Sequence, residues 1–318
     1  MSKKLFSVLS LMILTGCLYD FAGQESQEIN YQITSQATVE TAIQNISQAH
    51  MNEIIIKLSS FPTRSSYTQS GLDAFTWIEN HWREITNNRA DVDISLFDHQ
   101  NHIQSSIILT ITGSDPNLKN EIIVLGAHGD SINANSNDIH AIAPGADDNA
   151  AGVAVLSEIL RRLVETDYKP QRTLQFIIYA AEEPQDRASC ELTRWYRQNN
   201  QNVMGVINFD GTNYKVGEYD IVLIDDYTNK EQNTFIGSLI DTYVKVKWAW
   251  QTCGYQCSDH ASWSIEGYRA SFPFESLLAI ENPNIHTAND TFDKSGNNSE
   301  HASLFVKLGL AYLIELDK

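Results

Sequence analysis

The sequence has few basic residues and no apolar run long enough to cross a membrane. It contains 22 Lys and Arg against 40 Asp and Glu, which gives a formal net charge of −18. Nucleic acids and anionic membrane surfaces would repel such a chain, so neither is expected as a partner. The apolar run at residues 5–14 is too short to span a bilayer, and no transmembrane segment is expected. No internal repeat or low-complexity tract is visible, which argues against a repeat architecture.

The N-terminal residues form a targeting pattern. Lys3 and Lys4 precede the apolar run, which ends in the sequence LTGC at Cys17. This pattern predicts a signal peptide over residues 1–17. Two interpretations stay open: LTGC is a lipobox and Cys17 carries a lipid anchor, or the segment is an ordinary signal peptide. We therefore expect export from a bacterial cell to the periplasm or the medium, or to the outer membrane if Cys17 is acylated.

The remainder of the chain predicts one domain of the α/β class. Its 318 residues can form a single large α/β domain, and no change in composition marks a second one. We expect an N-terminal extension over residues 18–40 and one catalytic domain over 41–318. Apolar runs predict strands at 92–97, 107–111, 121–127, 172–181, 203–209, 219–224 and 267–274. Helical spacing of apolar residues predicts helices at 51–61, 71–85, 150–163, 231–246 and 300–316.

One stretch, residues 126–152, combines histidine and aspartate side chains between a predicted strand and a predicted helix. His128 and Asp130 follow the strand, and Asp148 precedes the helix. Alone, a His-x-Asp pair is typical of a capped turn, and an Asp-Asp pair of a helix start. In open α/β sheets ligands bind at the carboxyl ends of strands, where a histidine and a carboxylate suit a divalent cation. The stretch therefore predicts a metal site if later strand ends add further ligands.

The next two strands do add acidic residues at their ends. Glu182 and Glu183 follow one of them, Asp210 follows the other, and His286 lies in a loop before the last predicted helix. Paired glutamates are commonly a solvated loop tip. A functional interpretation assigns one to a cation and the other to proton transfer from a metal-bound water. Two histidines and three carboxylates in total suit two zinc ions that share one carboxylate.

The four cysteines are interpreted by their spacing. Cys253 and Cys257 lie four residues apart in a chain expected to be exported, which predicts a small disulfide loop with Tyr255 at its tip. A zinc site on these two thiols is disfavoured, because no second Cys or His pair has matching spacing. Cys190 remains and is expected to be a buried free thiol.

Seven motifs occur in the order found in the M28 family of zinc peptidases, and the chain resembles its bacterial, Vibrio-type leucyl aminopeptidase branch. The motifs are AHGDS (127–131), APGADD (143–148), AAEE (180–183), FDGTNY (209–214), CGYQCSDHASW (253–263), PFES (273–276) and IHT (285–287). The resemblance runs from about residue 33 to near the C-terminus. It implies a zinc-exopeptidase fold: a three-layer α/β/α sandwich with a mixed, mostly parallel central sheet.

The resemblance also implies roles for individual residues. Two zinc ions per chain would be held by His128, Asp148, Glu183, Asp210 and His286. Asp148 would bridge the ions, with His128 and Asp210 at one and Glu183 and His286 at the other. Glu182 would be the general base that takes a proton from the bridging water and returns it to the leaving amine. The peptide bond after Asp148 is often cis in this family.

Further implied roles concern the substrate. Asp130 would orient the first histidine, and Tyr255 would hydrogen-bond the reacting carbonyl. An apolar cup for the first side chain would be formed by Cys253, Cys257, Phe272 and Phe274. One departure is clear: the family often has a glycine-rich segment after the two glutamates, whereas residues 184–189 have the sequence PQDRAS. The resemblance therefore does not predict the shape of that loop.

The expected function is that of an exported dizinc aminopeptidase. It would act as a monomer on peptides with a free N-terminus and prefer large apolar, leucine-like residues. One alternative is a glutaminyl-peptide cyclotransferase on the same fold with one zinc; the set of five ligands argues against it. A carboxypeptidase-like relative would need a basic residue for a C-terminal carboxylate, and none can be pointed to. The non-enzymatic alternative is a zinc-stabilised binding protein, which would have no need of Glu182.

Overall fold

The computed structural model describes residues 29–87, 89–184 and 187–318. The strands are β1 (Val92–Phe97), β2 (Ser106–Ile111), β3 (Glu121–His128), β4 (Thr173–Tyr179), β5 (Asn202–Asn208), β6 (Ile221–Ile224), β7 (Trp248–Gln251) and β8 (Ala270–Phe274). The α-helices are α1 (Gln36–Ala42), α2 (Gln48–Ser59), α3 (Gln69–Thr86), α4 (Gly152–Glu165), α5 (Ser189–Gln198), α6 (Lys230–Leu239), α7 (His260–Ile265) and α8 (Ala302–Leu316). The predicted signal peptide and Cys17 lie outside the described residues.

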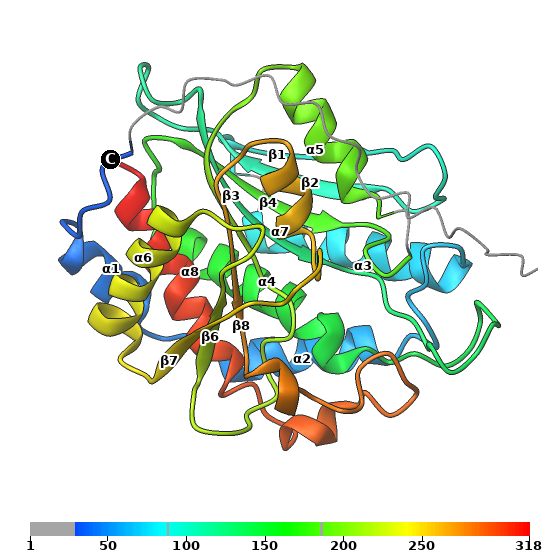
Figure 1. Ribbon diagram of the computed structural model, residues 1–318. Coiled ribbons are helices and arrows are strands. Elements are labelled where there is room, and N and C mark those ends of the chain that lie inside the picture. Colours follow the sequence, from blue (N-terminus) through cyan, green and yellow to red (C-terminus); the bar gives the residue numbers. More distant parts are fainter. Residues whose placement is uncertain (1–28, 88, 185–186) are drawn as a thin grey trace, which may run out of the picture.

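A mixed sheet of eight strands forms the middle layer, in the order β1-β2-β4-β3-β5-β8-β6-β7. Helices cover both of its faces, with α5 and α7 on one side and α2, α3, α4 and α8 on the other (Figure 1). The predicted three-layer α/β/α sandwich is therefore confirmed. β3 pairs in parallel with β4 and β5, and β5 with β8. Because parallel strands end at one edge of a sheet, the segments that follow β3, β4 and β5 lie together.

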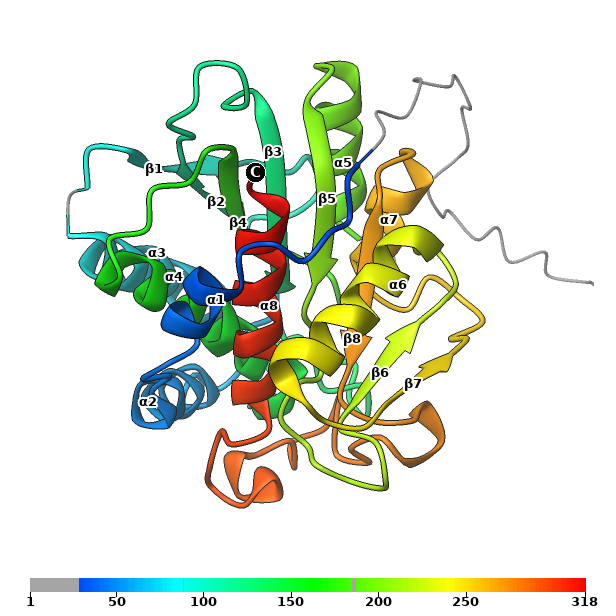
Figure 2. The ribbon, with the colours of Figure 1, turned by 90° about the vertical axis from the view of Figure 1, so that its left-hand side faces the viewer.

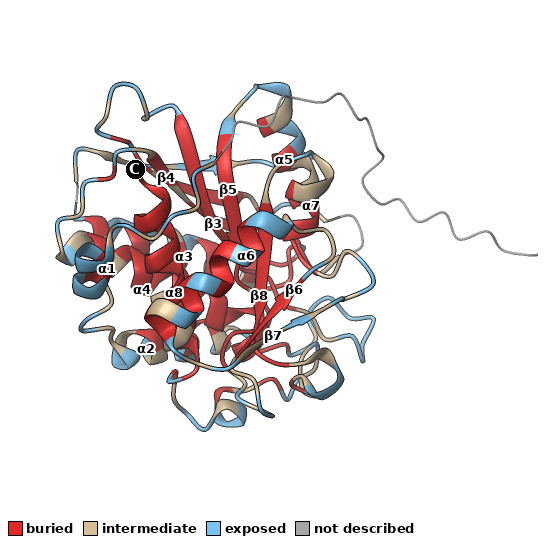
Figure 3. Cartoon of the chain, turned by 60° about the vertical axis from the view of Figure 1, so that its left-hand side comes forward, coloured by how far each residue is buried: buried red, intermediate tan, exposed pale blue. Residues whose placement is uncertain are grey.

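Alternate side chains of β3 enter two separate cores. Ile123 and Leu125 pack into the larger core on the α4 and α8 side, whereas Ile122 and Val124 pack into the core beneath α5 and α7. Both faces of the strand are covered, which explains why its sequence is a continuous apolar run rather than an alternating one. Figure 3 shows β3 and its neighbour β5 buried over most of their length.

Several elements differ from the sequence-based expectation. Helices α1, α5 and α7 and strand β7 were not predicted. Helix α1 crosses the boundary expected at residue 40 and lies beside α8 (Figure 2). The carboxylate of Glu315 in α8 accepts hydrogen bonds from the backbone N–H groups of Thr34 and Ser35, at 2.8 and 3.0 Å. These two hydrogen bonds attach the segment just before α1 to α8.

The cysteines confirm one expectation and correct another. Cys253 and Cys257 form a disulfide, with their Cα atoms 6.5 Å apart. Cys190 is also disulfide-bonded, so the prediction of a free thiol is wrong. The sequence around a single cysteine does not show whether it is paired, whereas two cysteines four residues apart predict a small disulfide loop. Among the described residues, no helix combines the length and apolar character that crossing a membrane requires.

Candidate metal centre

Three neighbouring strands place the predicted residues at one edge of the sheet. His128 is the last residue of β3 and lies opposite Tyr179, the last residue of β4. Glu182 and Glu183 follow β4 within four residues, and Asp210 follows β5 by two. Asp148 lies between β3 and α4, at a kink of the segment Ala146–Ala151 where its own backbone is not helical (φ −112°, ψ 91°). The parallel register thus brings residues that are far apart in the chain to one place.

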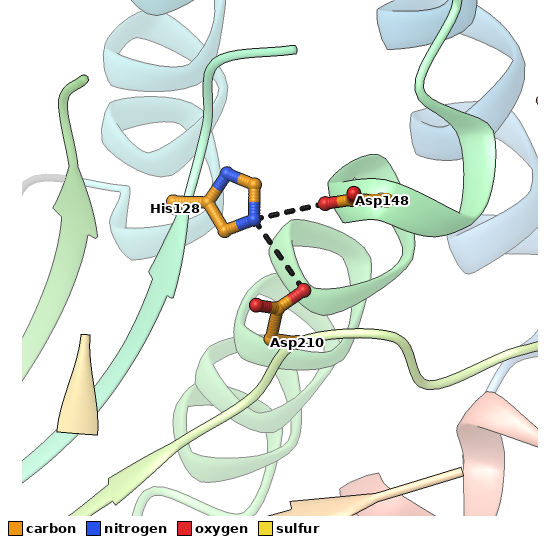
Figure 4. Close-up of side chains that lie close together, drawn as sticks. All are labelled: His128, Asp148 and Asp210. Carbon is orange, nitrogen blue, oxygen red and sulfur yellow. Dashed lines mark ion pairs between the residues drawn. The ribbon is translucent and has the colours of Figure 1, made fainter. Parts of the chain in front are cut away.

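The first cluster joins His128, Asp148 and Asp210. The Nε2 atom of His128 lies 3.0 Å from Oδ1 of Asp148 and 3.4 Å from Oδ1 of Asp210. In Figure 4 one nitrogen of the imidazole faces both carboxylates, Asp148 from the segment before α4 and Asp210 from the segment after β5. The three candidate ligand atoms lie within 4.8 Å of one another, a spacing that fits one small cation between them.

The second cluster joins the same aspartate to Glu183 and His286. The Nε2 atom of His286 lies 2.8 Å from Oδ2 of Asp148 and 3.1 Å from Oε2 of Glu183. His286 is delivered by the loop between the 3₁₀ turns Leu278–Ile280 and Phe292–Ser295. The two oxygens of Asp148 therefore face different histidines, and each belongs to a different cluster. This is the arrangement expected of a carboxylate shared by two cations.

Asp130 supports both the first histidine and the glutamate pair. Its Oδ1 atom lies 3.4 Å from Nδ1 of His128. Its two carboxylate oxygens also accept hydrogen bonds from the backbone N–H groups of Glu182, at 3.0 Å, and Glu183, at 3.3 Å. Asp130 is fully buried. One side chain thus lies next to an imidazole nitrogen and holds the path of the chain after β4.

Asp210 is held by a residue to which the sequence analysis gave no role. The hydroxyl of Ser258 donates a hydrogen bond of 2.6 Å to Oδ2 of Asp210. The side-chain amide of Asn208 in turn donates to Ser258 Oγ at 2.7 Å. Only the motif at 253–263, which contains Ser258, could have drawn attention to it.

Arg64 is a second residue that the sequence analysis missed. It lies between the helices predicted at 51–61 and 71–85, in a segment for which no element was predicted, and its side chain is fully buried. Its guanidinium donates to the backbone carbonyls of Gly129 and Gly145, each at 2.8 Å, and also to that of Pro144. It thereby joins the two ends of the loop that carries His128 and Asp148. The Asp148–Asn149 peptide bond is cis, as the resemblance implied.

The carboxylates of the two clusters favour the protonated, positively charged forms of the two histidines. The carboxylates of Asp148 and Glu183 raise the pKa of His286 to about 12. Burial lowers the pKa of His128, but Asp210, Asp130 and Asp148 outweigh it and raise that pKa well above its usual value. Burial likewise opposes ionisation of Asp148, whereas the two histidines hold its pKa far below the usual range. A site that holds two protons so firmly suits cations, which would displace those protons from the imidazoles.

The comparison with protein families agrees with this geometry. Residues 106–309, more than half of the chain, match the model of peptidase family M28. The chain belongs to peptidase family M28. Its predicted membership and predicted enzyme class, a peptidase of this family, are therefore confirmed.

Curated relatives and solved structures extend the comparison. A probable leucine aminopeptidase from Arthroderma benhamiae is 33% identical over 88% of this chain and 77% of its own length. A probable aminopeptidase from Saccharomyces cerevisiae is 32% identical over 90% of this chain and 77% of its own. LapB of Legionella pneumophila has a TM-score of 0.82 and 31% identity, covering 92% of this chain and 78% of LapB. A glutaminyl cyclase from an Acidobacteriales bacterium, at 14% identity and a TM-score of 0.66, covers 86% of this chain and 95% of its own and shares the fold.

The curated relatives correct the expected cellular location. They come from fungi, among them Arthroderma benhamiae, Arthroderma otae and Saccharomyces cerevisiae, and point to a eukaryotic protein. The prediction of export from a bacterial cell is therefore contradicted. A basic and apolar N-terminal pattern does not by itself identify the kind of cell.

In this M28 chain Glu182 lies next to Arg187, which follows the two glutamates in the segment that lacks the glycines of the family. The guanidinium of Arg187 lies 2.7 Å from Oε1 of Glu182. It also donates to the backbone carbonyls of Gln256, at 2.9 Å, and Ser258, at 3.1 Å. Burial raises the pKa of Glu182 well above its usual value, and Arg187 acts in the opposite direction. Arg187 thus places a positively charged guanidinium, held by two backbone carbonyls, next to the carboxylate of Glu182.

A cavity of about 500 Å³ opens beside the clusters of the M28 site. Four of the predicted substrate residues line it: Tyr255, Cys257, Phe272 and Phe274. Cys253 instead packs against the small core formed by Ile224, Phe272 and Phe274. Cys257 packs against the same core and also lines the cavity.

His260, behind this cavity, gives a pH-dependent prediction. Burial and the nearby Arg187 lower the pKa of His260 to about 3, from an unfolded value of 6.5. The unfolded chain then binds more protons between these two values, so folding stability should fall as pH drops from about 6.5 toward 3. One proton corresponds to at most about 1.4 kcal/mol per pH unit. Denaturant unfolding of the metal-free protein should show that the free energy of unfolding falls less steeply with decreasing pH in His260→Gln than in the wild type. An identical fall in both proteins would contradict the lowered pKa of His260.

Proposed function

We propose that this M28 peptidase is a dizinc aminopeptidase that removes N-terminal residues, preferably large apolar ones, from peptides. One observation carries the proposal: two clusters of candidate ligands share the two oxygens of Asp148. The names of the curated relatives support the aminopeptidase activity.

The donor set fits zinc. Each cluster offers one imidazole and two carboxylates, which are ligands that zinc accepts in catalytic sites with a position left for water. In the proposal His128 and Asp210 hold one ion, and Glu183 and His286 hold the other. Bound zinc would lower the pKa of a water molecule and polarise a substrate carbonyl.

Glu182 has the properties that a proton carrier needs. It lies beside both clusters but belongs to neither, and it is buried. Its raised pKa moves it toward the range in which a carboxylate can both accept and return a proton. In the proposed reaction Glu182 accepts a proton from the attacking water and delivers it to the leaving amine. Arg187, at 2.7 Å, keeps one carboxylate oxygen in place.

The cavity would orient the substrate. Tyr255 lines it, and burial together with Glu281 raises the pKa of Tyr255. The phenol therefore keeps the proton that it would donate to the carbonyl oxygen of the scissile bond. Phe272, Phe274 and Cys257 offer an apolar surface to the first side chain. The acidic surroundings suit the free amino group of the substrate.

The test compares free and blocked substrates alongside a zinc count. We expect hydrolysis of leucine p-nitroanilide, no hydrolysis of its N-acetyl form, loss of activity with a chelator and recovery with zinc at two ions per chain. Equal rates on the free and blocked anilides would refute an aminopeptidase. One zinc per chain with cyclisation of N-terminal glutamine would instead support a glutaminyl cyclase.

A further inference from the structure

Glu281 is a carboxylate of the catalytic cavity to which the proposed chemistry assigns no role. It directly follows the 3₁₀ turn Leu278–Ile280 and precedes His286 by five residues. It lines the same cavity as Tyr255, Phe272 and Phe274. It belongs to neither candidate metal cluster.

The carboxylate of Glu281 has no partner among residues 29–87, 89–184 and 187–318: no hydrogen bond or ion pair reaches it there. Two buried glutamates of the described residues show the usual arrangement, in which the carboxylate is paired. Glu158 contacts His50 and Arg161, and Glu121 contacts Arg172. Burial raises the pKa of Glu281, and the aspartates of the metal clusters raise it further against the effect of His286. A half-buried carboxylate in an acidic cavity is costly unless a positive group from outside joins it.

The walls around Glu281 restrict what that positive group can be. Leu278, three residues earlier, packs with Phe272 and Phe274 in one apolar cluster and lines the cavity with them. A ligand side chain entering here therefore meets apolar surface and a carboxylate in the same cavity. Lysine and arginine have this composition, because a long apolar stem carries their charged end.

We propose that Glu281 is a specificity-determining residue that extends the substrate range to peptides with N-terminal lysine or arginine. The stem of the side chain packs on Phe272 and Phe274, and its cationic end pairs with Glu281. The inference rests on the proposed aminopeptidase function. It adds basic N-terminal residues to the apolar ones as substrates. An N-terminal leucine would use the same apolar surface without contacting the carboxylate.

The experiment measures kcat/KM for lysine, arginine, leucine and norleucine p-nitroanilides. Norleucine has the unbranched stem of lysine without the charge, so the pair isolates the carboxylate contact. For Glu281→Gln we expect at least a tenfold loss on lysine and arginine and a change below twofold on leucine and norleucine. Retained leucine hydrolysis also shows that the variant is folded. Glu218→Gln is the matched control, because Glu218 pairs with Lys247 and does not line the cavity; it should change none of the four values.

Three results would overturn the inference. An equal loss on all four substrates would mean that Glu281 binds the α-amino group. Unchanged lysine and arginine hydrolysis in Glu281→Gln would mean that the carboxylate does not touch the side chain. Leucine hydrolysis by the wild type without lysine or arginine hydrolysis would reject this inference alone, whereas no cleavage of any free-amine anilide would reject the proposed function itself.

Discussion

Replacing Glu182 by Gln is expected to lower kcat on leucine p-nitroanilide by about 10²- to 10⁴-fold, the range typical of a lost general base. Gln has the same size but cannot accept the proton of the attacking water. The zinc content should equal that of the wild type, because Glu182 supplies no atom to either candidate cluster. Steady-state kinetics and metal analysis on the same preparation give both quantities.

A control must separate loss of the base from loss of a buried ion pair. Glu121, at the opposite end of β3, lies 2.6 Å from Nε of Arg172 and is also buried. Glu121→Gln breaks a comparable glutamate–arginine contact far from the clusters, and its kcat should stay within twofold of the wild type. If Glu182→Gln kept nearly full activity, or lost zinc while Glu121→Gln did not, Glu182 would not have the proposed role.

Replacing Asp148 by Asn is expected to remove both zinc ions or leave them weakly bound, with loss of activity. Asp148 is the residue common to the two clusters, so its change weakens both positions at once. The loss of affinity should exceed the 10- to 100-fold that is typical when a residue behind a metal ligand is changed. Competition with a chromophoric chelator measures both affinities.

Asp147 provides the matched control for Asp148. It precedes Asp148 and is equally buried, but its oxygens accept hydrogen bonds from the backbone N–H of Asn213 and the amide of Asn282, each at 3.0 Å. Asp147→Asn should therefore reduce stability and still bind two zinc ions with affinities near those of the wild type. Zinc binding that survives Asp148→Asn but not Asp147→Asn would reverse the assignment of these neighbouring carboxylates.

The positions of the candidate ligands could be predicted because they depend on strand ends. The run at 122–127 is apolar on both faces, as expected of a central parallel strand, and it directly precedes His128. Parallel pairing then brings the residues after β4 and β5 to His128. The sheet and its edge follow from local patterns and a general rule of α/β folds.

Contacts that depend on side-chain direction could not be predicted. Ala181 has a left-handed backbone conformation, with φ of 49°, directly before Glu182. The sequence does not predict such a conformation at an alanine, and so it did not predict the contact between Glu182 and Arg187. The sequence showed Arg187 only as a charged residue in a loop whose shape was not predicted. The role of Arg64 was missed because the burial of an arginine depends on backbone carbonyls supplied by distant residues.

Short elements with few apolar residues were also missed. Helix α1 buries only Val39 and Ala42, too few to show a helical period in the sequence. Its attachment depends on Glu315, which lies near the other end of the chain. The disulfide state of Cys190 also escaped prediction, because the residues around a single cysteine do not show whether it is paired.

The central claim, that two cations share Asp148, is tested most directly by anomalous diffraction at the zinc absorption edge on crystals of the zinc-loaded protein. We predict two anomalous peaks, one among His128, Asp148 and Asp210 and the other among Asp148, Glu183 and His286. A single peak, or peaks that lie away from Asp148, would contradict a dinuclear site and the mechanism built on it.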